Sequence, residues 1–149
     1  MRSRLDYADF RKLAPATDKG LFATAADTAG LDTRLVELVK VRASQINGCA
    51  HCIFVHAGKA VAAGESHARL LLLDAWREAQ VFSERERAAL AWCEALTLVT
   101  EGHVPDEVYA EAQAVFGDAE LAALTSAIVV INAWNRISIA YRLLPPIKE

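Results

Sequence analysis

Two thiols and two imidazoles lie within eight residues of this chain, in the run Cys49-Ala-His51-Cys52-Ile-Phe-Val-His56. The run follows Gly48, which can open a helix. On a helix that advances by about 100° per residue, Cys49, Cys52 and His56 fall within one narrow stripe. Two thiols at this spacing near a helix start can form a short-range disulfide, and an adjacent imidazole can help to deprotonate one of them. The spacing therefore indicates thiol redox chemistry.

The residue spacing leaves open which of the two sulfurs is the nucleophile. The thiolate is the reactive form, and a free cysteine with a pKa of about 8.5 is mostly protonated at neutral pH. A helix N-terminus stabilises negative charge within its first turn, which favours Cys49. His56 is four residues after Cys52 and seven after Cys49, so it can approach either thiol.

The elements that must position these residues are helices. The chain has only seven glycines and four prolines, mostly at breaks, and no segment with a clean period of two. Asp32 or Thr33 can cap one helix, and Ser83 with Glu86 matches a capping box that opens another. The pattern predicts one all-α domain over residues 1–149, with helices over about 16–29, 33–47, 49–63, 66–79, 84–100, 105–117 and 118–144.

Composition narrows the class of protein. A net charge of −3, from 16 basic and 19 acidic residues, argues against a nucleic-acid partner or an anionic membrane. The charged N-terminus lacks the apolar centre of a signal peptide, and the most apolar stretch, 121–131, is too short to span a bilayer. We therefore expect a cytoplasmic protein without a membrane partner. In that reducing compartment a close cysteine pair is catalytic or metal-binding more often than structural.

Glu37, followed after eleven residues by the Cys49-x-His51-Cys52-x-x-x-His56 string, resembles the active-site signature of AhpD-like alkylhydroperoxidases. These proteins belong to the carboxymuconolactone decarboxylase superfamily. The segments 41–48 and 131–136 also resemble that family, and the similarity extends over roughly residues 16 to 144.

The resemblance implies an all-α AhpD-like fold that assembles into homotrimers or homohexamers and reduces organic hydroperoxides. Cys52 would then attack the peroxide, and Cys49 would resolve the sulfenic acid as a disulfide. Glu37 and His56 would form the proton relay, and His51 lies where the family places a histidine or an aromatic residue near the site. A dithiol reductant such as a lipoylated protein would reopen the disulfide. We expect no cofactor and no bound metal.

Each residue also has a purely structural interpretation. The cysteines could be small apolar core residues, and His56 could be a core histidine. Glu37 lies three residues from Arg34 and from Lys40, which fits a solvated face of ion pairs. On the helical wheel His51 points away from the thiols. Cys93 is best explained by core packing, and Asn132, Asn135 and Arg136 are expected to pair with acidic residues.

Three other functions are compatible with the same residues. Cys49, Cys52, His56 and Glu37 include the donor types that zinc accepts. The dithiol could also act as a general thiol-disulfide oxidoreductase on protein disulfides. The third alternative is a non-enzymatic helical assembly protein whose thiols only respond to oxidation. An oligomer is expected because 54% of the residues are hydrophobic and some of that surface should meet other subunits.

Overall fold

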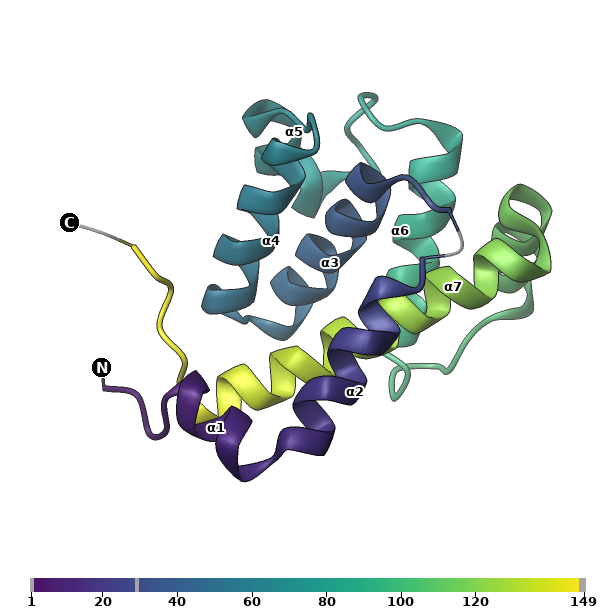
Figure 1. Ribbon diagram of the computed structural model, residues 1–149. Helices are drawn as coiled ribbons and strands as arrows, with labels where there is room; N and C mark the ends of the chain where they lie inside the picture. The colour runs from purple at the N-terminus through teal and green to yellow at the C-terminus, as the bar shows by residue number, and fades with distance from the viewer. Residues whose placement is uncertain (1, 29, 148–149) are drawn as a thin grey trace.

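The computed structural model describes residues 2–28 and 30–147, and this part of the chain contains helices and no strands (Figure 1). The predicted all-α class is confirmed. In chain order the elements are α1 (Tyr7–Leu13), α2 (Pro15–Ala26), α3 (Thr33–Asn47), α4 (Ala50–Ala62), α5 (His67–Leu72), the short 3₁₀ helix η1 (Leu73–Ala75), α6 (Glu84–Thr97) and α7 (Asp106–Tyr141).

Helix α3 lies at the centre of the bundle, where it contacts α4, α6 and α7. Its Leu38 and Val39 side chains are completely buried. Helix α2 lies along α7, while α3 and α4 run side by side (Figure 1). Among the described residues, the larger of two core clusters joins α3, α6 and α7 and includes both Cys49 and Cys52. The candidate thiol site is therefore part of the main core.

Local capping signals place most of the helix boundaries correctly. The Asp32 side chain accepts a hydrogen bond from the Arg34 amide at the start of α3, and Ser83 and Glu86 form the predicted capping box of α6. Gly117 has φ 65° and ψ 177° and interrupts α7, at the break predicted between the last two helices. Such a backbone conformation is available to glycine at low cost.

Other boundaries differ from the prediction. The predicted end of the first helix at Ala29 lies outside the described residues. The helix predicted over 66–79 is wrong beyond Leu72, where α5 ends. In the segment that follows, the carbonyls of residues 76, 77 and 79 accept hydrogen bonds from the Arg87 guanidinium. The last helix ends at Tyr141, before the prolines expected to stop it. Helix α1 was not predicted, since seven residues are too few to show a period.

Helix α7 is much longer than the apolar stretch 121–131, which is too short by itself to span a bilayer. The stretch 121–131 continues on both sides into a 36-residue helix, and α7 alone in the described part has the length and composition to cross a membrane. Contacts with α2, α3 and α6 make it the long core helix of this bundle, and 44% of its most apolar window is buried.

Candidate functional site

The turn between α3 and α4 positions the first cysteine. Gly48 adopts the left-handed conformation, with φ 69° and ψ 31°. The amide of Gly48 donates to the Gln45 carbonyl at 3.1 Å, and the amide of Cys49 donates to the Ser44 carbonyl at 2.9 Å. These are the two hydrogen bonds of a Schellman motif, in which glycine avoids steric strain. The motif ends α3 and delivers Cys49 directly to the start of α4.

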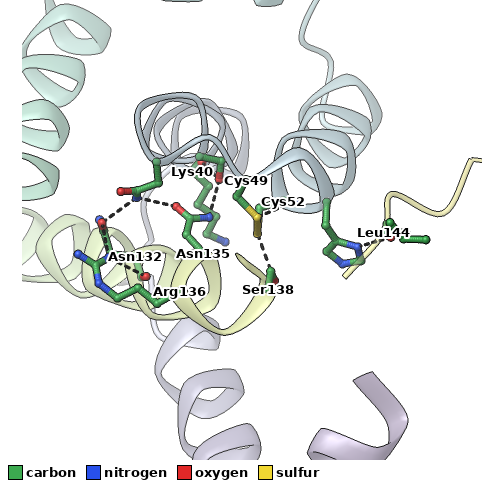
Figure 2. The surroundings of a disulfide bond; sticks show 11 residues. Lys40, Cys49, Cys52, Asn132, Asn135, Arg136, Ser138 and Leu144 are labelled. Carbon is green, nitrogen blue, oxygen red and sulfur yellow. Dashed lines mark hydrogen bonds between the residues drawn. A yellow bond between two sulfur atoms is a disulfide. The ribbon is translucent and has the colours of Figure 1, made fainter. Parts of the chain in front are cut away.

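Cys49 is the N-cap residue of α4, so it precedes the helix that was predicted to contain it. Its Sγ accepts a hydrogen bond from the Cys52 amide at 3.3 Å. The two sulfurs are joined in a disulfide, and the residues are only 2% and 3% exposed. On the other side, Cys52 Sγ lies 3.5 Å from Ser138 Oγ of α7 (Figure 2). The disulfide is therefore buried, with Cys52 lying between α4 and α7.

Glu37 of α3 lies at the centre of a buried charge cluster. Its Oε2 is 2.6 Å from His56 Nδ1, and its Oε1 accepts a hydrogen bond from Lys40 Nζ at 2.8 Å. Burial of Glu37 favours the neutral carboxyl, but the hydrogen bonds from His56 and Lys40 outweigh burial and lower its pKa to about 2. Glu37 is therefore a carboxylate at neutral pH, and the interpretation as a solvated face is wrong.

The ionised state of Glu37 determines the tautomer of His56. A carboxylate can only accept hydrogen bonds, so His56 Nδ1 carries the proton of this short contact. Burial lowers the pKa of His56 below 6.5, against the opposing attraction of Glu37. At neutral pH the imidazole is uncharged and Nε2 retains its lone pair. His56 is thus held as a proton acceptor.

Cys52 and His56 open into the same cavity, of about 460 Å³. Cys49 is not among the described residues that line it. The lining comes from α1, α2, α3, α4, α7 and the segment after α7: Tyr7, Phe22, Ala25, Ala26, Lys40, His51, Cys52, Val55, His56, Lys59, Val130, Ile131, Trp134, Ser138 and Leu143. The volume lies within the range of about 300–1,000 Å³ that is typical of small-molecule sites. The cavity can therefore admit a small molecule to Cys52.

His51 lies at the edge of this cavity, although the helical wheel places it away from the thiols. Its Nδ1 is 2.8 Å from the carbonyl oxygen of Leu144. The segment that follows α7 turns back to the start of α4 and contributes Leu143 to the cavity lining. His51 therefore contacts the C-terminal segment and borders the cavity that holds Cys52.

A chain of hydrogen-bonded amides behind the cysteines, with Asn135 buried and Asn47 and Asn132 partly buried, was not identified from the sequence. Asn135 is completely buried, donates to Ser44 Oγ at 3.0 Å and accepts from Asn47 Nδ2 at 2.8 Å (Figure 2). Asn47 also donates to Asn132 Oδ1, and Arg136 binds Asn132 as well. Within the described part of the chain, these α7 residues pair with amides, a hydroxyl and a carbonyl, so the expected pairing with acidic residues of another helix is wrong, while pairing across a subunit interface stays a prediction. The amides instead fasten α7 to the helix that leads into Cys49.

Replacing Asn135 by alanine should lower the free energy of unfolding by about 2–4 kcal/mol, because Ser44 and Asn47 lose a buried partner and a cavity is left. Urea denaturation measures this loss. Ser126→Ala is the matched control, since Ser126 is partly exposed on the same helix and its hydroxyl donates to the Ala122 carbonyl of its own helix. Equal stability of the two variants would contradict a structural role for the amide chain.

The donors considered for zinc do not converge in this arrangement. Both Glu37 oxygens are engaged by His56 and Lys40, and the cysteine sulfurs are bonded to one another. Within residues 2–28 and 30–147, no group of three or more His, Cys, Asp or Glu side chains is arranged to hold a metal ion.

The described part of the chain combines a fold of helices, a buried CxxC disulfide and a Glu–His pair. These features place it in the class of helical proteins with a redox-capable cysteine pair. The carboxymuconolactone decarboxylase family model matches residues 10–95. The uncharacterized protein YdfG of Bacillus subtilis (strain 168) is 43% identical over 104 residues, which cover 70% of this chain and 71% of YdfG. This chain belongs to the carboxymuconolactone decarboxylase family, and the resemblance seen in the sequence is confirmed.

A solved structure extends the similarity to α7. The crystal structure of a protein of unknown function from Agrobacterium tumefaciens, for which the identity of antioxidant defence protein AhpD has been suggested, matches with a TM-score of 0.90. It is 36% identical in sequence, and the match covers 99% of this chain and 100% of that one. The AhpD-like fold is therefore shown for the chain.

Proposed function

We propose that this protein is a thiol-dependent peroxidase that reduces organic hydroperoxides through a Cys49/Cys52 dithiol–disulfide cycle. The observation that carries the proposal is the shared cavity of Cys52 and His56. It puts a thiol and a neutral imidazole, held in one tautomer by Glu37, on the wall of a space of small-molecule size. A base next to a thiol is the arrangement that nucleophilic catalysis by cysteine requires.

In the proposed cycle, His56 Nε2 takes the proton of the reduced Cys52 thiol. The thiolate attacks the distal oxygen of the hydroperoxide, the O–O bond breaks, and the protonated His56 returns the proton to the leaving alkoxide. The products are an alcohol and a sulfenic acid on Cys52. The Cys49 thiol then condenses with the sulfenic acid to form the disulfide and release water. Two thiols are oxidised and one hydroperoxide is reduced.

The two sulfurs take different roles in this proposal because their surroundings differ. Cys52 lines the cavity and can meet a substrate there. Cys49 caps α4, where the helix N-terminus stabilises a thiolate that attacks the sulfenic acid one turn away. This division supports Cys52 as the peroxidatic cysteine.

Burial supports a small oxidant over a protein disulfide. The folded surface of a protein cannot approach sulfurs on residues that are 2% and 3% exposed. We propose that the reductant is likewise a slender dithiol, of which a lipoyl group on a partner protein is an example. Thiol–disulfide exchange with it would return both cysteines to the thiol form.

We also propose that the chain works as a homotrimer or homohexamer. Its support is the set of large apolar side chains left in solvent by the single chain, including Leu71, Val129, Ile139, Leu144 and Ile147. Large apolar side chains that are exposed in a single chain are commonly buried at an interface between subunits.

A single-turnover experiment tests the peroxidase. Fully reduced protein is mixed with one equivalent of cumene hydroperoxide, and peptides are mapped by mass spectrometry. We expect a Cys49–Cys52 disulfide to form as fast as the peroxide disappears. Cys93→Ala should behave identically, because Cys93 is completely buried and burial raises its pKa to about 12. Intact peroxide with both thiols free would refute the proposal.

A further inference from the structure

One face of α4 borders the cavity over two turns. Cys52, Val55, His56 and Lys59 all line it, at positions i, i+3, i+4 and i+7 of the helix. At 1.5 Å per residue, the backbones of Cys52 and Lys59 are separated by about 10 Å along the axis. The reactive sulfur and an ammonium group thus mark two ends of one wall.

The charge of the cavity differs in sign from that of the chain. The chain carries a net charge of −3, yet the described residues that line the cavity include two lysines, two histidines and no Asp or Glu. The positive charge of Lys40 is compensated by the carboxylate of Glu37, which accepts its hydrogen bond. Lys59 is exposed and forms no salt bridge within the described part of the chain. The uncompensated charge of the lining is therefore that of Lys59.

Another part of the lining is aromatic. Trp134 of α7 packs against Tyr7 and Phe22, with ring centroids 5.9 and 5.5 Å from its own. All three side chains line the cavity, together with aliphatic residues of α4 and α7. These aromatic side chains suit an aromatic or branched apolar group of a ligand, because the transfer of its apolar surface from water to this part of the cavity is favourable.

We propose that the cavity selects amphipathic carboxylates: ligands with an apolar body against Trp134 and a carboxylate that pairs with Lys59. If the proposed peroxidase function holds, on which this assignment of a substrate class rests, the substrates are hydroperoxides with a carboxylate at the end remote from the O–O bond. Lys59 is then a specificity residue, since it binds the substrate without contacting the reacting atoms.

The test measures binding to the disulfide form, so it does not depend on turnover. Isothermal titration calorimetry compares 4-isopropylbenzoate with 4-isopropylbenzamide, which has a similar shape and no charge. At low ionic strength we expect the benzoate to bind about fivefold more tightly, as for a partly exposed ion pair. In Lys59→Gln this preference should disappear while the affinity for the amide stays unchanged.

Lys19→Gln is the matched control, because Lys19 is an exposed lysine of α2 outside the cavity lining, and it should keep the full preference. Equal binding of the two ligands to the unmodified protein would overturn the proposal, as would no binding of either or a preference that survives in Lys59→Gln. A carboxylate preference without peroxide turnover would refute the peroxidase function alone. Turnover without the preference would refute the substrate class alone.

Discussion

Cys52→Ser should reduce peroxide consumption by roughly a thousandfold or more, because a hydroxyl at this position cannot act as the thiolate nucleophile. The substitution should leave the fold intact, since serine is nearly isosteric and can bond to Ser138 Oγ, 3.5 Å from the present sulfur. Stopped-flow measurement of cumene hydroperoxide loss by the reduced variant checks the rate. Circular dichroism checks the helical fold.

Cys49→Ser separates the roles of the two sulfurs. Serine is a preferred N-cap residue, so the start of α4 should keep its cap. This variant should consume one equivalent of peroxide and then stop, with a sulfenic acid on Cys52 that dimedone traps. Loss of the first attack in Cys49→Ser, with retention in Cys52→Ser, would reverse the assignment and make Cys49 the nucleophile.

Glu37→Gln should slow the first reaction with peroxide about 100-fold. A glutamine amide can donate to His56 Nδ1 and so stabilise the tautomer in which Nε2 carries the proton and no longer accepts one. The rate of peroxide loss at neutral pH measures the effect. Glu101→Gln, the same change at an exposed carboxyl, should leave the rate unaltered. Unchanged kinetics in Glu37→Gln would remove Glu37 from the proton relay.

Glu37→Gln should also lower the stability of the fold. Lys40 is only 8% exposed and would lose its carboxylate partner, so the free energy of unfolding should fall by about 3 kcal/mol at neutral pH. The pKa of Glu37 is about 2 in the fold, below its ordinary 4.5, so the folded state binds this proton more weakly than the unfolded state. The stability from Glu37 is therefore complete above pH 4.5 and is lost as the pH falls toward 2.

Denaturant titrations at a series of pH values check this dependence. The difference in stability between the unmodified protein and Glu37→Gln should be constant above pH 4.5 and shrink below it. A difference that does not change with pH would mean that the glutamine perturbs packing and that the charge of Glu37 contributes nothing.

The features that the sequence determines are those set by neighbours within about one helical turn. The Asp32 and Ser83 caps and the break at Gly117 depend on side chains and backbone angles close in the chain, and all three are present as predicted. The spacing of Cys49 and Cys52 brings the two sulfurs within bonding reach whatever the rest of the chain does. Periodicity over whole helices was sufficient for the fold class.

The tertiary structure decides which of these residues can react with a ligand. The burial of Glu37 follows from the packing of α3 against α4, α6 and α7, and a helical wheel cannot distinguish it from a solvated ion-pair face. Ser138 lies beside Cys52 although 86 positions separate them in the chain. The cavity exists because α1, α2 and α7 meet α4 there. Contacts at such separations depend on the packing of whole helices, which local spacing does not encode.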